Sequence, residues 1–136
     1  MITITTLLDG PRTAIYHVYL LNEGTDVDLV NEPLVVPANM VPVCERLVLE
    51  EVSYNFAGLD AKLSFDNGTV DGSLIWVLGE GNDGQVDFCR FGGLKDREYF
   101  DGSGTLRLTT VGFTQLGDEG SMIIKVRKAG KSQYAG

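Results

Sequence analysis

The sequence has little of the material from which catalytic and metal-binding sites are usually built. Its 136 residues include one histidine, His17, and two cysteines, Cys44 and Cys89, which form no C-x-x-C motif. A common zinc site needs three or four such ligands close together, so we expect no metal and no cofactor. The G-x-S-x-G, H-E-x-x-H and P-loop motifs are also missing. We therefore expect that the protein is not an enzyme.

Positive charge is scarce as well. Eleven Lys and Arg residues stand against 19 Asp and Glu residues, which gives a net charge of −8. Nucleic-acid binding depends on basic groups that neutralise phosphates, so nucleic acid is not an expected partner. Residues 122–136 are the exception, because they hold four basic residues and no acid. This segment could dock on an acidic neighbour, including another copy of the chain, or it could be a solvated terminal strand and tail.

Long hydrophobic runs are missing too. The longest apolar stretches are far too short to cross a bilayer, so we expect no membrane partner. The opening MITITTLLDG has neither the basic start nor the apolar stretch of a signal peptide. We expect synthesis and assembly in a reducing cytoplasm, where buried free thiols are more common than disulfides.

What the sequence does contain is short alternating segments separated by turn residues. In the segment 59–65, Leu59, Ala61, Leu63 and Phe65 share one side and polar residues share the other. Seventeen glycines and pairs such as Asn-Gly and Asp-Gly mark turns between such segments. The pattern predicts an all-β, antiparallel β-sandwich or barrel-like single domain with little helix over residues 1–128, followed by a flexible basic tail at 129–136. The other predicted strands are 2–8, 12–21, 47–56, 73–79, 85–91, 105–113 and 121–128.

Several of these segments carry expectations about which side chains face inward. The segment 12–21 is apolar on both sides, which is typical of a central strand, and His17 within it is expected to be packed or hydrogen-bonded in the core. Trp76 lies in another two-sided apolar run and is expected in the core. The alternation in 47–56 predicts that Val48, Val52, Tyr54 and Phe56 share one face.

Two irregular stretches look suited to contacts with other proteins. Residues 30–43 contain three prolines, so they cannot form a central strand. We expect them to form an extended edge or a crossing arm that could lie along another chain. The segment DFCRFGGLKD (87–96) ends a predicted strand at a Gly-Gly pair and leads into a polar loop that carries two aromatics. Exposed aromatics tend to mark contacts, although the two rings could instead fold back as a lid. The candidate contact residues are Pro33, Leu34, Pro37, Met40, Pro42, Phe91, Leu94, Arg97, Tyr99, Phe100, Lys125, Arg127 and Lys128.

Other chemistry has weaker support in the sequence. Carboxylates and amides cluster on the turns 66–71 and 80–87, where calcium could bind, but their spacing is not that of an EF-hand loop. A glycosidase with paired carboxylates would need a deep cleft that so short a chain rarely builds. A small enzyme that uses Cys89 with His17 stays open as an alternative, because distant residues can meet in a fold.

The chain resembles the small all-β virion proteins of tailed bacteriophages, especially capsid decoration (cement) proteins. The resemblance is seen in the opening MITITTLLDGPRTAIYHVYLLNEG and in the segment DFCRFGGLKD. The resemblance implies a sandwich that sits as a trimer or dimer on the outside of the virion. There it would bind the major capsid protein and brace the shell through many weak contacts. The alternatives are another head-tail, neck or tail component, or a carbohydrate-binding β-sandwich, for which Trp76, Tyr99 and Tyr54 are the aromatic candidates.

Overall fold

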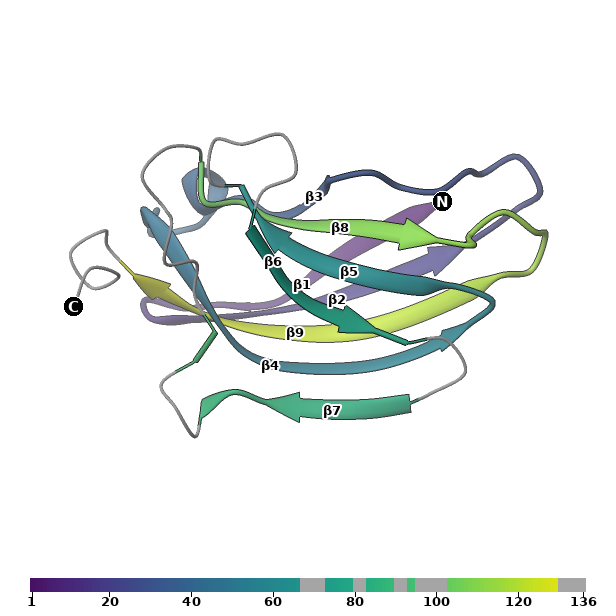
Figure 1. The fold of residues 1–136 in the computed structure, drawn as a ribbon. Helices are drawn as coiled ribbons and strands as arrows, with labels where there is room; N and C mark the ends of the chain where they lie inside the picture. Colours follow the sequence, from purple (N-terminus) through teal and green to yellow (C-terminus); the bar gives the residue numbers. More distant parts are fainter. Residues whose placement is uncertain (67–72, 80–82, 90–92, 95–102, 130–136) are drawn as a thin grey trace.

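Two antiparallel β-sheets pack face to face in this protein (Figure 1). The computed structural model describes residues 1–66, 73–79, 83–89, 93–94 and 103–129. Within these residues there are nine strands, one short 3-10 helix and no α-helix, so the all-β prediction is confirmed. The elements are β1 (Ile2–Asp9), β2 (Thr13–Leu21), β3 (Glu32–Val35), η1 (Pro37–Asn39), β4 (Arg46–Ala57), β5 (Asp60–Phe65), β6 (Ser73–Leu78), β7 (Asp83–Asp87), β8 (Leu106–Val111) and β9 (Glu119–Ala129).

The strand order is that of a jelly roll with one extra strand. The first sheet runs β1-β2-β9-β4-β7 and the second runs β3-β8-β5-β6. Apart from the β1–β2 and β5–β6 hairpins, every connection passes from one sheet to the other. Without β1, two four-stranded sheets remain whose order and crossings are those of a double-sheet jelly roll. β1 therefore extends the first sheet beyond its partner.

The core lies between the two sheets and consists of aliphatic and aromatic side chains. In β2 every second residue is buried, and the predicted inward set Leu59, Ala61, Leu63 and Phe65 is at most 1% exposed. Each fully buried aliphatic or aromatic side chain contributes about 1.5–3 kcal/mol through removal from water. The interior of the described part is mostly apolar, and its few buried polar or charged residues are Asn22, Arg46, Ser64, Thr105 and Thr110. One large cluster of apolar side chains forms the core. Its members on the central strands include Tyr16, Val18, Leu20, Met122, Ile124, Val126, Leu106 and Leu108.

A β-bulge in β4 changes which residues of that strand face the core. The pairing register with β9 shifts between Leu49 and Glu51. Leu49 before the bulge and Val52 after it both join the main core, whereas Val48 packs with Ala129 in a separate small cluster. One inserted residue reverses the side to which the alternation points. The prediction that Val48 shares a face with Val52 is therefore wrong.

The proline-bearing segment folds onto the body of the protein. β3 forms an edge strand of the second sheet, as the prolines predicted, and pairs with β8. Leu34, Pro37 and Met40, however, are buried in this chain's own core. These three side chains are unavailable to a partner, which corrects the expectation of a free arm at those positions. At the other end of the chain, Ala129 is the last, buried residue of β9 and not the first residue of a tail.

Trp76 sits at one side of the sandwich, where the edge strands β6 and β7 approach. Its indole is 39% exposed and packs edge-to-face on Phe88, with ring centroids 5.2 Å apart. The expectation of a core tryptophan is wrong because β6 is the last strand of its sheet, so no further strand covers the ring. The contact joins the two sheets at this side.

Candidate functional site

The outer face of the first sheet carries rows of polar side chains that run across its strands. The register aligns His17 of β2 with Ile123 of β9, Ile123 with Ser53 of β4, and Ser53 with Gln85 of β7. The next row contains Ser121 and Asn55. Because strand side chains alternate between faces, these residues point away from the core that their neighbours fill.

These rows surround a shallow depression of about 460 Å³. We call it the polar depression. It spans four adjacent strands, and none of its lining residues carries a formal charge when the histidine is neutral. The lining consists of His17, Ser53, Tyr54, Asn55, Gly84, Gln85, Ser121, Met122 and Ile123.

Several polar side chains of this depression are not engaged by any other residue in the part of the chain that the structure describes. Among the described residues, no hydrogen bond or ion pair involves the side chains of His17, Ser53, Asn55, Gln85 or Ser121. Each amide side chain offers two N–H donors and a carbonyl oxygen with two lone pairs. The depression therefore presents a set of donors and acceptors that are available to a ligand.

His17 does not occupy the core position predicted for it. It is half-buried on the outer face, because its neighbours Tyr16 and Val18 point inward. β9 and β4 separate β2 from β7, after which Cys89 follows. Three strand spacings place these strands about 14 Å apart, so the structure does not bring His17 and Cys89 together as a catalytic pair.

Cys89 is exposed and lies next to two carboxylates, which corrects the expectation of buried thiols; Cys44 is half-buried. Possible ligand atoms of Cys89, Glu51 and Asp87 all lie within 4.8 Å of one another. Desolvation and the nearby carboxylates of Asp87 and Glu50 raise the pKa of Cys89 to about 11. At neutral pH the group is thus a protonated thiol beside acids, which disfavours both nucleophilic attack and metal ligation by sulfur.

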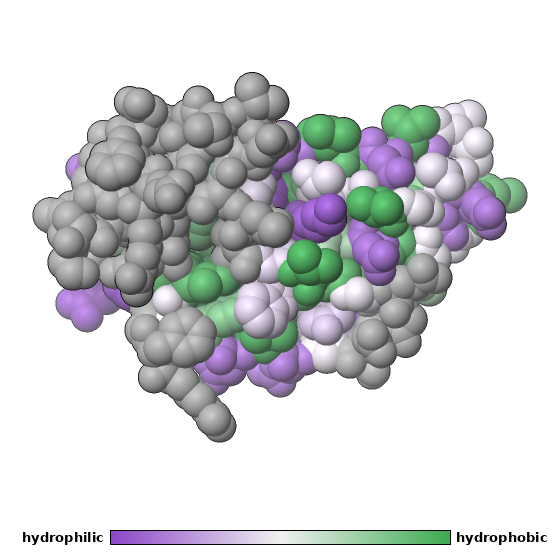
Figure 2. Space-filling model, viewed as in Figure 1, coloured by the Kyte–Doolittle hydropathy of each residue, from purple (hydrophilic) through white to green (hydrophobic). Residues whose placement is uncertain are grey.

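β1 forms an uncovered edge of the first sheet. It is the last strand in its sheet, so no other strand of the described ranges borders the outer edge of its backbone. Ile4, Leu7 and Leu8 are 38%, 54% and 48% exposed. A small bulge at Leu7 interrupts the pairing with β2 and leaves residues 2–6 as the regular stretch. Figure 2 shows the surface from the same side as Figure 1, and on it hydrophobic and hydrophilic residues of the described part are interspersed.

The basic residues predicted to contact a partner are partly engaged within the chain. Lys128 is 5% exposed, lies 2.7 Å from Asp9 and donates a hydrogen bond to the carbonyl oxygen of Pro42 at 2.9 Å. Hydrogen bonds from Lys128 and from a backbone N–H lower the pKa of Asp9. Arg127 lies 3.9 Å from a Glu50 oxygen. Lys128 therefore stabilises this chain, and its predicted role as a docking residue is corrected.

The remaining predicted contact residues are scattered. Pro33 and Pro42 are exposed, and Lys125 is half-buried opposite Glu51 in the register. Leu94 is half-buried and exchanges two backbone hydrogen bonds of 2.8 Å with Leu49. The other four candidates lie outside the described residues: Phe91, Arg97, Tyr99 and Phe100.

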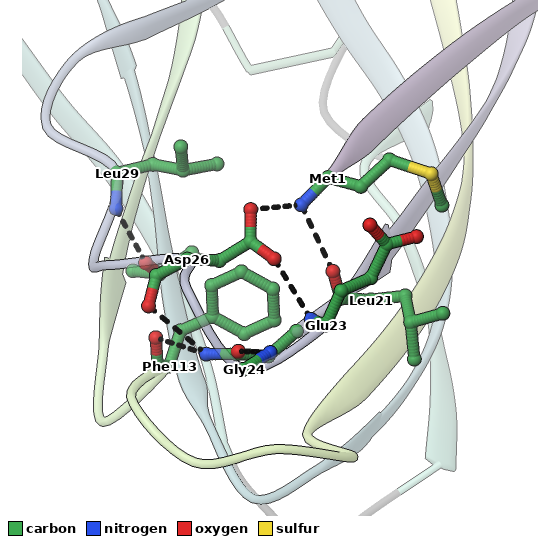
Figure 3. A network of polar contacts seen from close by, with 9 residues as sticks. Met1, Leu21, Glu23, Gly24, Asp26, Leu29 and Phe113 are labelled. Carbon is green, nitrogen blue, oxygen red and sulfur yellow. Dashed lines mark hydrogen bonds and ion pairs between the residues drawn. The ribbon is translucent and has the colours of Figure 1, made fainter.

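A second polar cluster lies at the loop end of the sandwich and differs from the depression in its bonding (Figure 3). Asn22 is 1% exposed, and its amide donates to the carbonyl oxygens of Phe113 at 3.1 Å and Asp26 at 3.2 Å. Its side-chain oxygen accepts a hydrogen bond from the backbone N–H of Gly24 at 2.8 Å. The Asp26 carboxylate accepts from the backbone N–H of Glu23 at 2.8 Å, and this bond is the main cause that lowers the pKa of Asp26. We call this group the loop cluster.

The sequence did not predict that the residues of the polar depression would lie together in one site. Alternation in 12–21 could have identified the outward set, but both sides of that segment are rich in apolar residues. The segment therefore did not indicate which side faces solvent. Of the lining residues, Tyr54 alone was named as a candidate for carbohydrate contact. Its ring turns to the opposite face, where it packs against the core and stacks on Phe56 with ring centroids 5.7 Å apart.

Comparison with known proteins places the chain in no family. No protein-family model matches it, and no curated protein matches it. Among solved structures, an RmlC-like cupin family protein with a double-stranded β-helix fold from Methanocaldococcus jannaschii is similar at 10% identity and a TM-score of 0.34. The alignment covers 94% of this chain and 80% of that one. Among the described residues, none forms a helix of the length and hydrophobicity that a bilayer crossing requires.

Proposed function

We propose that this chain is a structural protein that acts through protein–protein contacts, as a decoration protein on the capsid of a tailed bacteriophage. The observation that carries the proposal is the uncovered edge strand β1, which presents a free backbone edge together with exposed Ile4, Leu7 and Leu8. An exposed strand edge is a template for pairing with a strand of another chain.

Natural proteins usually protect such an edge with lysines, prolines or inward-pointing charges. β1 contains no lysine and no proline, and its single acid, Asp9, is paired with Lys128. The bulge at Leu7 interrupts the far end, but residues 2–6 remain regular. The strand is therefore suited to intermolecular pairing, and no charge along it opposes a second chain.

The architecture fits the same role. Jelly rolls serve as viral capsid and lectin domains, among others, so the fold is compatible with a virion protein but does not select it. The apolar side chains between the sheets make a rigid core that leaves the working contacts to the surface. On a shell, repetition turns weak contacts of each copy into a strong total by avidity. The partners in this proposal are the major capsid protein and further copies of the chain.

The contact role can be tested with charges placed on β1. Ile4→Lys/Leu8→Lys should abolish self-association and binding to purified capsids, because two ammonium groups would have to be desolvated at the interface. Sedimentation-velocity centrifugation and capsid co-sedimentation measure both effects. The matched control is Val77→Lys/Val111→Lys, which adds the same charges at sites that are 52% and 48% exposed on β6 and β8 of the second sheet. Equal binding by the wild type and the β1 variant would contradict the proposed interface.

The virion role needs a separate measurement. Quantitative mass spectrometry of purified particles from the phage that encodes the chain should find many copies, in a simple ratio to the major capsid protein. A few copies per particle would indicate that the protein belongs to the neck or tail and not to the capsid surface. Absence from the particles would exclude the virion role.

A further inference from the structure

We infer that the polar depression on the outer face of the first sheet binds a neutral oligosaccharide. This site is separate from β1, so it goes beyond the proposed structural role and does not depend on it. The inference rests on the bonding state, charge and shape of the lining residues.

The first step is the chemistry of the lining. Asn55, Gln85, Ser53 and Ser121 present amide and hydroxyl groups that engage no partner among the described residues. Sugar hydroxyls both donate and accept hydrogen bonds, and they therefore match groups that also do both. Within the described ranges no internal bond has to break when a ligand binds, and the paired strands fix the Cα positions from which these side chains extend.

The second step is charge. The lining itself is uncharged. In the register, Asp83 of β7 stands opposite Asn55, in the same row as the lining. Further ionisable residues lie one row away: Glu51 and Lys125 on one side and Glu119 on the other. Glu119 already accepts a hydrogen bond of 2.8 Å from the Tyr19 hydroxyl. An anionic ligand would face mostly acidic neighbours, and a cationic ligand would find no carboxylate among the lining residues, so a neutral ligand is favoured.

The third step distinguishes a sugar from a protein partner. The cores of protein interfaces are apolar and depleted in serine, whereas this lining is mostly amide, hydroxyl and imidazole. Ile123 is 44% exposed between His17 and Ser53, and it offers a small apolar contact for the C–H face of a sugar ring.

The depression has room for a ligand because the side chains of Tyr54 and Met122 turn to the opposite face, where they pack against the core. Across β2, β9, β4 and β7 the platform is about 14 Å wide, which suits a short oligosaccharide laid across the strands.

The test begins with a glycan array that carries neutral, sialylated and sulfated oligosaccharides, probed with the full chain. Isothermal titration with the best neutral oligosaccharide on the array then gives Kd. Asn55→Ala/Gln85→Ala should weaken binding about tenfold or more, because two hydrogen-bonding side chains are lost. The matched control, Asn39→Ala/Gln115→Ala, removes one exposed Asn and one exposed Gln elsewhere and should change Kd less than about twofold.

Three results would overturn the inference. They are no binding to any neutral glycan, binding restricted to charged glycans, and equal Kd values for the wild type and Asn55→Ala/Gln85→Ala. Thermal melts of both variants establish that they are folded. Ser53→Ala/Ser121→Ala removes two other lining hydroxyls and should also weaken binding. The β1 variant Ile4→Lys/Leu8→Lys should keep the wild-type Kd, so failure of this site and failure of the β1 interface are distinguishable.

Discussion

The loop cluster and the polar depression use the same residue types for opposite purposes. Asn22 in the loop cluster is buried and makes three hydrogen bonds, whereas Asn55 in the depression is exposed and makes none through its side chain among the described residues. The difference follows from what the local backbone needs. Where the backbone is irregular, polar side chains form hydrogen bonds with its unpaired N–H and C=O groups. Where the backbone is regular, polar side chains remain unbonded and can contact a ligand.

Loops must satisfy N–H and C=O groups that no ladder pairs, because an unpaired buried polar group costs free energy. Asp28 illustrates this, since its carboxylate accepts hydrogen bonds from the backbone N–H of Phe113 at 2.8 Å and from the Thr110 hydroxyl at 3.1 Å. In the sheet, the strands β2, β9, β4 and β7 already pair their backbones. Side chains on the outer face are thus free to contact a ligand.

The largest expected effect is the loss of the buried amide. Asn22→Ala should lower the free energy of unfolding by about 2–3 kcal/mol, because two backbone carbonyls and one N–H lose their partner in a buried site. Asn55→Ala should change it by less than about 0.5 kcal/mol, as for most exposed positions. Urea unfolding followed by tryptophan fluorescence measures both. A similar loss of unfolding free energy for the two variants would contradict the proposed difference between the loop cluster and the polar depression.

A somewhat smaller effect is expected at the ion pair that ties β9 to β1. Lys128→Met should cost about 1–2 kcal/mol, because it leaves Asp9 without its cation, and the 22% exposure of that carboxylate keeps the loss below that of a fully buried pair. Lys125→Met on the outer face serves as the control, with an expected change below about 0.5 kcal/mol. Chemical denaturation at pH 7 compares the two. An equal loss for both lysines would show that burial of the pair does not matter.

The same pair predicts how stability depends on pH. The folded-state pKa of Asp9 lies below its ordinary value of 3.8, so its contribution is present above that pH and is lost as the pH falls through the folded-state pKa. Thermal melts of the wild type and of Asp9→Asn should therefore differ most near neutral pH and converge as the pH falls below 3.8. A difference that stays constant from pH 7 to pH 2 would contradict the assignment.

The smallest effect concerns reactivity and leaves stability unchanged. Since the pKa of Cys89 is raised to about 11, its alkylation by iodoacetamide at pH 7.5 should be about 100-fold slower than that of an ordinary thiol with a pKa near 8.5. Glu50→Gln should speed the reaction by removing a nearby negative charge. Mass spectrometry in a Cys44→Ser background isolates this thiol. Rapid alkylation of the unaltered site would mean that the neighbouring acids do not hold it protonated.

Much of the fold could be predicted because alternation is a local property. Eight of the nine described strands overlap predicted segments, and the ninth, β3, lies in the segment predicted to be an extended edge. The overlap is smallest at β7, which spans Asp83–Asp87 where the prediction was 85–91. The inward set from Leu59 to Phe65 was also predicted correctly. The errors occurred where a distant part of the chain decides the outcome. Val48 was misplaced by a bulge that exists only against β9, and Trp76 by the position of β6 at the end of its sheet.

The sequence by itself determined that this chain forms antiparallel strands around an apolar core, since every second side chain of a strand must share a face. It also determined the acidic character and the single histidine. The tertiary structure alone decided that β1 lies at an uncovered edge and that His17, Ser53, Asn55 and Gln85 meet on one face. Those outcomes depend on strand order and register, which are set by the packing of residues far apart in the chain.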